Sequence, residues 1–438
     1  MQTGSTKRGL FSWALYDWAN SAVPTVIITF IFSAYFTRSV APDEITGSQV
    51  WGTVVGISGF LVAILGPLLG SAADHTGRRK PWILLFTLLC VASTAGLWWI
   101  LPDASLMWQA ALLVGAATIG LELAIVLYNA MLPDLVGKAY IGRWSGWGWA
   151  LGYAGGLLCL VVVLFLFIEE ESRIVSFDTE SAGHLRAGFV FVAAWFAIFS
   201  IPFFLFTGET RKSGVSLGRG VREGLAQLAD TVRHVRRYSH IVRFLVARIF
   251  YVDGMATLFA FGGVYAAGTF GMDEKEILLF GIALNVTAGL GAFLFSWVDD
   301  YMGSQRTILL SLAGIIIPGT VLLLAQSETV FWIAGLVIGI FVGPVQSASR
   351  SYMAHVAPPD MTNQMFGLLA FSGKATAFLG PLLVGWLTWA TGSQRIGMSV
   401  IIILLCAGFL IMLKVPRVLE RDSAVVRSSP PDTVRQHE

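Results

Sequence analysis

The sequence predicts an all-α membrane protein whose twelve transmembrane helices form two six-helix halves. Hydrophobic residues make up 55% of the 438 residues and charged residues only 13%, whereas a soluble domain usually carries about 25% charged residues. Twelve separate apolar runs are long enough to cross a bilayer. A charged motif also recurs 226 residues further along the chain, which indicates that the second six spans repeat the first six.

The expected spans follow from apolar runs of about 20 residues. They cover residues 12–37, 49–70, 82–101, 106–131, 145–168, 185–207, 243–269, 277–298, 307–325, 330–348, 365–390 and 396–413. Asp17 and Asn20 interrupt the first run, which has no small-residue cleavage site, so it is expected to remain as a helix. Cys90, Cys159 and Cys406 lie inside these runs and are expected to be small core residues.

Positive residues are unevenly divided between two sets of loops. Alternate assignment of the loops places 22 Lys and Arg on the side of the N-terminus and five on the other, with Arg248 and Lys374 inside spans. Cytoplasmic loops of membrane proteins carry an excess of positive residues. The chain is therefore expected to lie in the cell membrane with both termini in the cytoplasm, which requires an even number of spans.

A polar segment between the two halves sets the expected domain boundaries. The N-terminal half is expected at 1–208, the linker at 209–242, the C-terminal half at 243–416 and a disordered tail at 417–438. Within the linker, apolar residues recur at helical spacing between arginines. A basic amphipathic helix of this kind suits the headgroup region of an anionic leaflet, and a solvated linker is the alternative.

The charged motif lies in the stretch 70–82, GSAADHTGRRKPW, between two apolar runs. Its charge predicts a short loop in water. The stretch SWVDDYMGSQR repeats its skeleton later in the chain. The positions that share the spacing are Asp74 and Asp300, Gly77 and Gly303, and Lys80 and Arg306.

The first copy resembles the loop between the second and third helices of the major facilitator superfamily, G-x-L-x-D-x-x-G-R-[K/R]-x-x, with Ala72 in place of Leu. The second copy has Ser296 where the first has Gly70, so Asp300 is expected to matter less than Asp74. Further motifs are similar to those of the subfamily that includes the autophagy-related vacuolar amino-acid effluxers of fungi and bacterial relatives. These motifs are WALYDWANSAVPTVIITF, YNAMLPDL, GWGWALGYAGG, GPVQSASRSYMA and FGLLAFSGKATAFLGP.

This resemblance implies the major facilitator fold and a breakable gate on the cytoplasmic side. Such a gate would combine charge pairing with a carboxylate near a helix N-terminus. A role in membrane insertion through the positive-inside rule is the alternative, and both can hold. The expected gate residues are Gly70, Asp74, Gly77 and Arg78, with Asp300, Gly303 and Arg306 from the second copy.

Ionisable side chains inside spans cost about 2.5–3.5 kcal/mol each on the translocon scale and need a cavity or a partner. Glu122 lies near the middle of the fourth span; a substrate or proton site is preferred there over an ion pair that holds helices together. For Lys374, contact with substrate and a buried ion pair are both open. Arg248 and Asp253 lie about 140° apart around one helix, so they are not expected to point at one spot. Arg350 ends the tenth span.

The resemblance also implies that the first, fourth, seventh and tenth helices line a central cavity. Lys374 of the eleventh span is added to the polar residues of those helices. The expected substrate or proton site comprises Asp17, Asn20, Glu122, Asn129, Arg248, Tyr251, Asp253, Gln346 and Lys374.

Acidic and basic groups in one cavity suit a small zwitterionic solute, and the resemblance implies amino acids. The sequence is thus expected to encode a secondary active transporter that works by alternating access, and efflux of amphipathic drug-like compounds is the alternative. The sequence has no HExxH, GxSxG, paired CxxC or Walker motif, so neither an enzyme, a cofactor nor a metal is expected. A receptor or structural membrane protein stays open.

The expected partners follow from this function. They are a small solute, protons as coupling ion, and membrane lipids. Nucleic acid is not expected, and the protein is expected to be a monomer.

Overall fold

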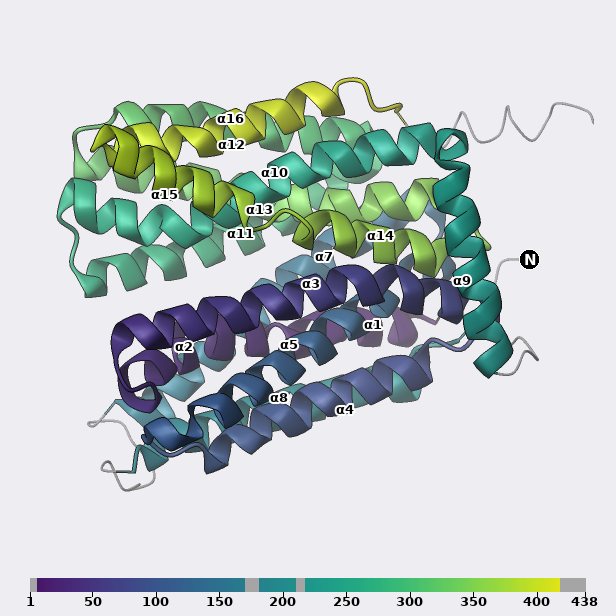
Figure 1. Ribbon diagram of the computed structural model, residues 1–438. Helices are drawn as coiled ribbons and strands as arrows, with labels where there is room; N and C mark the ends of the chain where they lie inside the picture. Colours follow the sequence, from purple (N-terminus) through teal and green to yellow (C-terminus); the bar gives the residue numbers. More distant parts are fainter. Residues whose placement is uncertain (1–5, 170–180, 210–216, 418–438) are drawn as a thin grey trace, which may run out of the picture.

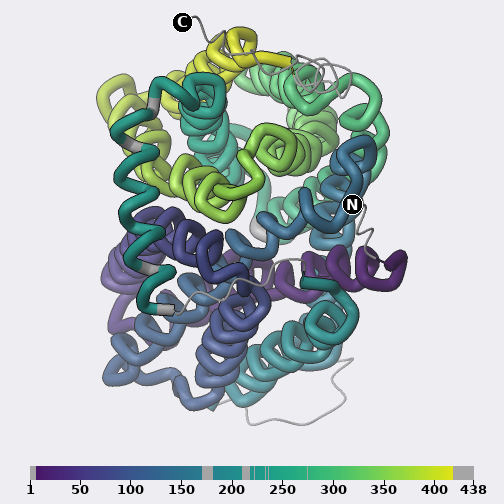
Figure 2. The backbone as a smooth tube through the Cα atoms, turned by 90° about the vertical axis from the view of Figure 1, so that its right-hand side faces the viewer, coloured from purple at the N-terminus to yellow at the C-terminus, as the bar shows by residue number. Residues whose placement is uncertain are grey.

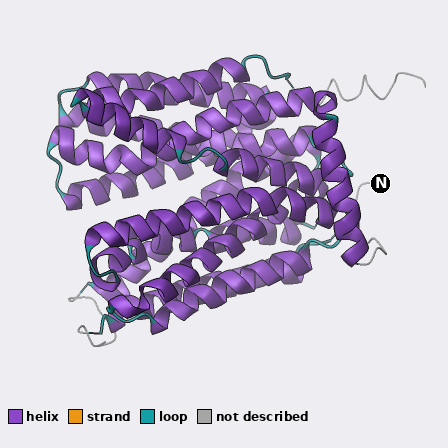
Figure 3. Cartoon of the chain, in the orientation of Figure 1, coloured by secondary structure: helices purple, strands orange, loops and turns teal. Residues whose placement is uncertain are grey.

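The computed structural model describes residues 6–169, 181–209 and 217–417. Over these residues the chain forms helices and loops and no strand (Figures 1 and 3). The expected disordered tail lies outside the described residues, apart from its first residue. Two helix bundles lie side by side, and the first and last described residues lie at the same end as helix α9 (Figure 1). This end is called the α9 end below.

Twelve helical spans within the described residues confirm the expected number. The first contains α1 (Lys7–Asn20) and continues through π-helical turns and α2 (Phe32–Tyr35) to Val40. The others of the N-terminal half are α3 (Glu44–Thr76), α4 (Lys80–Gly96), α5 (Met107–Asn129), α7 (Ile141–Val163) and α8 (Gly183–Phe206). Those of the C-terminal half are α10 (Ser239–Tyr265), α11 (Glu274–Met302), α12 (Ser304–Leu324), α13 (Glu328–Val356), α14 (Thr362–Lys374) with α15 (Leu379–Thr391), and α16 (Gln394–Met412). Between spans lie α6 (Leu132–Leu135) and α9 (Leu217–Arg233).

The expectation of a water-exposed loop at 70–82 is wrong for most of the stretch. Helix α3 continues to Thr76, and only residues 77–79 separate it from α4. The helix ends at Gly77, whose φ of 65° is the left-handed conformation that glycine adopts without strain. Ser71, Ala72 and Ala73 are buried, because the end of α3 packs against other helices instead of protruding into water.

The two halves meet mainly along α3 with α14 and along α7 with α11. Small residues permit the first contact: a Cβ on Gly70 would collide with the carbonyl oxygen of Asn363, and one on Gly367 would come 2.5 Å from that of Gly66. Backbones this close require glycine on at least one helix. Gly66 and Gly70 of α3 thus permit a close approach between the two halves.

Helix α9 runs across both halves at one end of the molecule (Figure 2). It packs on α3, where Ser71 Oγ donates a hydrogen bond of 2.7 Å to the carbonyl oxygen of Gly224. A Cβ at Gly224 would lie 2.8 Å from the backbone nitrogen of Ala72. The other half is reached through Gln364, whose Nε2 donates to Thr231 Oγ1 at 2.9 Å. The described linker is thus a helix docked on the bundle, with its arginines exposed.

At the opposite end, the halves enclose a cavity of about 380 Å³. The first span contributes Thr25, Thr29 and Phe30, and α10 contributes Phe259 and neighbouring residues. The lining is mostly apolar. The described structure is therefore hollow between the halves at one end and held together by helix contacts at the α9 end.

Candidate functional site

The eleventh span is broken in the middle. Helix α14 ends at Lys374 and α15 begins at Leu379. Pro381 explains the break, because proline cannot donate a backbone hydrogen bond and is tolerated in the first turn of a helix. The break exposes backbone carbonyl groups at the end of α14 and N–H groups at the start of α15, and such ends attract charge of opposite sign.

Two charged residues of α10 bind the two ends of this break. Arg248 Nη1 donates to the carbonyl oxygen of Leu369 at 2.5 Å and to Ser372 Oγ at 2.9 Å, in the last turns of α14. The Asp253 carboxylate, which is 3% exposed, accepts from the backbone N–H of Gly380 at 3.2 Å. Their separation around α10 thus directs the two side chains to two different ends of the broken helix.

Lys374, the last residue of α14, forms an ion pair with Glu122 of α5. The distance from Nζ to Oε1 is 2.7 Å, and the side chains are 34% and 26% exposed. The pair joins the two halves of the molecule. It has features of both alternatives, a structural ion pair and a substrate or proton site. The two side chains pair between helices, but they remain exposed enough for another charged group to reach them.

A second polar cluster surrounds Arg350, which is 4% exposed. From α13 of the C-terminal half, its Nη1 lies 2.9 Å from Asp17 Oδ2 and 3.0 Å from Asn129 Oδ1. Its Nε donates to Ser145 Oγ at 2.9 Å, and Nη2 donates to the Ser145 carbonyl oxygen at 2.6 Å. The guanidinium also lies 5.1 Å from the centre of the Trp13 ring. Three helices of the N-terminal half are thus bound by one arginine, which we call the Arg350 cluster.

The remaining polar residues of the expected cavity are dispersed. Tyr251 Oη lies 2.7 Å from Ser349 Oγ within the C-terminal half. Asn20 is buried, and its Nδ2 has no hydrogen-bond partner among the described residues. Gln346 is half-buried.

The nine residues therefore do not surround one cavity in this conformation. None of them lines the 380 Å³ cavity, which lies nearer the opposite end. Four of them lie at the break between α14 and α15 or pair with it: Glu122, Arg248, Asp253 and Lys374. Asp17 and Asn129 lie in the Arg350 cluster, and the other three, Asn20, Tyr251 and Gln346, belong to neither group. Helical spacing predicts on which face of its own helix each residue lies. It does not predict which residues of the two halves meet, because that depends on how the halves pack.

The expected gate contains a direct contact between the halves. Asp74 Oδ1 accepts from the backbone N–H of Asn363 at 3.0 Å and from its Nδ2 at 2.7 Å, and Oδ2 accepts from the N–H of Gln364 at 2.8 Å. These N–H groups belong to the first turn of α14, where a carboxylate is favoured. We call this the Asp74 contact.

The second copy of the motif makes the equivalent contact. Asp300 Oδ1 accepts from the backbone N–H of Arg143, in the first turn of α7, at 3.0 Å, and Oδ2 lies 3.3 Å from Arg143 Nε. Gly303, with φ 84°, separates α11 from α12. We call this the Asp300 contact; the sequence departures in this copy leave its geometry intact.

The basic residues of the gate differ from expectation. Arg78 is exposed, and its neighbour Arg79 forms the ion pair, with Nη1 2.6 Å from Asp134 Oδ2. Arg306 is half-buried and forms no ion pair within the described part of the chain. Arg79 was not expected in the gate, and Arg350 was noted only as a charge at the end of the tenth span and was not expected in the site. A charge at the end of an apolar span was the available signal for Arg350.

Over its described residues the chain forms twelve spans in two contacting halves, which is the architecture of the major facilitator fold. The proton:xylose symporter XylE superposes with a TM-score of 0.73 at 15% identity, covering 94% of this chain and 96% of that one. FucP, solved in the outward conformation, gives 0.72 at 11% identity over 93% of this chain and 99% of that one. At these identities the likeness concerns the fold.

The chain belongs to the family described as "Vacuole effluxer Atg22 like", which it matches over residues 39–142 and 140–423. It is 27% identical over 414 residues to the uncharacterized MFS-type transporter YxiO of Bacillus subtilis, covering 94% of this chain and 95% of the relative. It is 23% identical over 443 residues to autophagy-related protein 22 of Coccidioides immitis, covering 82% of this chain and 71% of the relative. The relatives are transporters, not enzymes.

Proposed function

We propose that this transporter exports or exchanges small polar metabolites such as amino acids by alternating access, with protons as coupling ion. The observation that carries this proposal is the Glu122–Lys374 ion pair at the break between α14 and α15. A zwitterion has both charges needed to replace it, because its ammonium suits Glu122 and its carboxylate suits Lys374. Broken helices at the centre of a span are typical substrate sites of transporters.

The orientation follows from charge. The α9 end carries the excess of Lys and Arg, so we place it in the cytoplasm of a cell-membrane protein. The described conformation is then closed to the cytoplasm by the Asp74 contact, the Asp300 contact and the Arg350 cluster, with its cavity toward the outside. Movement of one half against the other must break these contacts to open the cytoplasmic side. The protein acts as a monomer without cofactor or nucleic acid.

Counterflow in proteoliposomes tests this function. Proteoliposomes that contain the purified protein and are loaded with unlabelled amino acids should accumulate labelled amino acid from outside. Glu122→Gln and Lys374→Met should each reduce the initial rate of this accumulation at least tenfold. Asp230→Asn on α9, an exposed position, is the matched control. Wild-type protein that moves no amino acid under either direction of pH gradient contradicts the proposed substrate class.

Efflux of amphipathic drug-like compounds is a second candidate, favoured by the outward cavity. Phe30, Phe259, Phe280, Phe331 and Met398 line it, and apolar walls of this kind bind apolar ligands. A dye-accumulation assay in cells separates the candidates. Dye efflux that survives Glu122→Gln favours the apolar cavity as the substrate site.

A further inference from the structure

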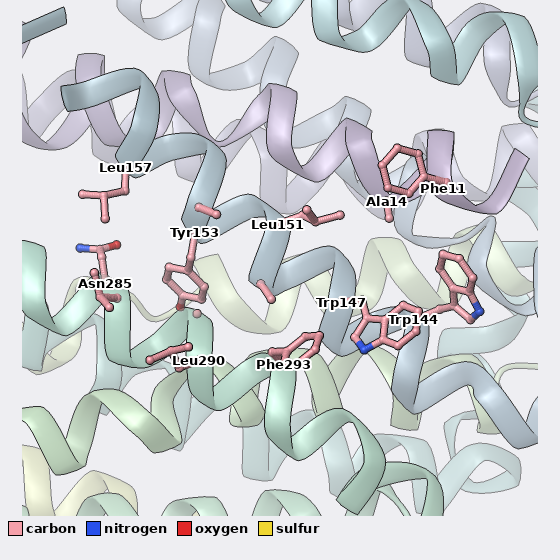
Figure 4. Close-up of a pocket in the computed structure, with 14 residues that line it drawn as sticks. Phe11, Ala14, Trp144, Trp147, Leu151, Tyr153, Leu157, Asn285, Leu290 and Phe293 are labelled. Atoms are coloured by element: carbon pink, nitrogen blue, oxygen red, sulfur yellow. The ribbon is translucent and has the colours of Figure 1, made fainter. Parts of the chain in front are cut away.

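A second, larger cavity lies between α7 and α11, outside the central one. It has a volume of about 540 Å³ and is walled by one helix from each half, with α1 at one end. Figure 4 shows Asn285 and Leu157 at one end of this groove, and Phe11 and Trp144 toward the other. Because α7 begins and α11 ends at the α9 end, the groove extends from mid-span toward that end.

The groove opens toward the membrane. Phe11 is 57% exposed and Leu290 56% exposed, and both walls are membrane spans. Its lining is almost entirely apolar. The one amide, Asn285, donates its Nδ2 to the carbonyl oxygen of Gly281 in its own helix at 2.8 Å. A surface of this kind is suited to hydrocarbon.

Basic and aromatic side chains lie at the α9 end of the groove. Lys7 is exposed and lies one turn before Phe11, on the same face of α1. The Arg143 guanidinium lies 5.2 Å from the Tyr140 ring and 5.9 Å from the Trp297 ring. Aromatic rings and positive charge at the end of a span are typical of the membrane interface on its anionic side.

We propose that this groove binds one phospholipid with an anionic headgroup from the leaflet at the α9 end. An acyl chain lies between α7 and α11, and the headgroup phosphate lies near Lys7. Arg143 is already paired with Asp300, so Lys7 supplies the attraction for the headgroup. Because the two walls belong to different halves, the lipid contacts both. Any difference in its affinity for two arrangements of the halves shifts their populations.

Native mass spectrometry of the purified full-length protein with added phosphatidylglycerol or phosphatidylcholine tests the site. Wild-type protein should retain one phosphatidylglycerol. Ala154, which lines the groove and is exposed, is replaced by Trp to fill it, and binding should fall at least tenfold. Ala194→Trp, at an exposed position of α8, is the matched control and should retain the lipid.

The headgroup is tested by Lys7→Gln. A basic residue near an anionic surface contributes enough to lower the preference for phosphatidylglycerol over phosphatidylcholine about fivefold. Lys275→Gln, exposed at the opposite end of the molecule, should leave the preference unchanged. Equal retention of both lipids by wild-type protein overturns the anionic headgroup.

A measurement on the wild-type chain avoids dependence on folding of the variants. Phosphatidylglycerol with a photoreactive group in the acyl chain should crosslink to peptides of α7 and α11. The proposal is overturned if the crosslinks are confined to other exposed helices. It is also overturned if a folded Ala154→Trp variant retains phosphatidylglycerol as the wild-type protein does. None of these readouts requires transport, so their failure is distinguishable from failure of the proposed function.

Discussion

Asp74 and Asp300, 226 residues apart, each accept a hydrogen bond from a backbone N–H in the first turn of a helix from the opposite half. Asp74 binds α14 and Asp300 binds α7. The repeat visible in the sequence is thus a repeated contact between the halves. Each carboxylate is placed where the partial positive charge of a helix terminus favours it, by up to about 2 kcal/mol in a partly buried geometry.

Asp74→Asn and Asp300→Asn should have comparable effects, contrary to the expectation from the weaker second motif. Each substitution removes the charge but keeps the size, and should raise the population open at the α9 end about fivefold for a loss of about 1 kcal/mol. Spin-label distances between Arg78→Cys and Asp360→Cys, both exposed, report this opening. If only Asp74→Asn increases the distance between the spin labels, Asp300 matters less than Asp74, as the sequence alone predicts.

Glu122→Gln and Lys374→Met should yield folded proteins with impaired transport. A partly exposed ion pair contributes about 0–1 kcal/mol, and this pair is 26% and 34% exposed. The melting temperature should therefore fall by only a few degrees, whereas a fully buried structural pair would cost about 3–5 kcal/mol. Large destabilisation in both single variants that the double variant reverses would identify the pair as structural.

Arg350→Met should destabilise the described conformation severely. Asp17 is only 14% exposed, and removal of its partner leaves a buried charge, at a cost of about 3–5 kcal/mol. The double variant Asp17→Asn with Arg350→Met should recover much of the thermal stability. Thermal unfolding of the three variants measures this coupling, and additive losses would contradict it.

Asp253→Ala should reduce both stability and transport. Loss of a capping carboxylate typically costs about 0.5–2 kcal/mol. Asp273→Ala, which removes the N-cap of α11, is matched to it in chemistry but lies away from the broken helix. Similar melting temperatures with impaired transport in Asp253→Ala alone would show that the N-terminus of α15 is functional; equal transport in both variants would leave only a structural role.

Gly224→Leu should release α9 from α3, because its side chain would meet the backbone at Ala72. Gly218→Leu is the control, since a Cβ there meets nothing within 4 Å. Limited proteolysis should cleave α9 faster in Gly224→Leu only. Equal cleavage would show that the contact between α9 and α3 contributes little to the position of α9.

The fold was predictable because each span is a local pattern of apolar residues, and the repeat of Asp74 at Asp300 marks the two halves. Glu122 and Lys374 were likewise identified as charges in apolar surroundings. Their pairing was one of the open alternatives, and it depends on how the halves pack. The length of helix α3 was underestimated because its last turns are polar and pack against other helices. Arg79 was missed because its neighbour Arg78 has the same chemistry.

The Asp74 contact has a consequence for covariation between positions. Backbone N–H groups supply two of its three hydrogen bonds, and every residue except proline provides such a group. Position 364 can therefore change its side chain without losing its bond to Asp74. Substitutions at position 74 and at positions 363 and 364 should therefore covary only weakly among related sequences, although these residues connect the two halves. The main sign of the contact should be the absence of proline at positions 363 and 364.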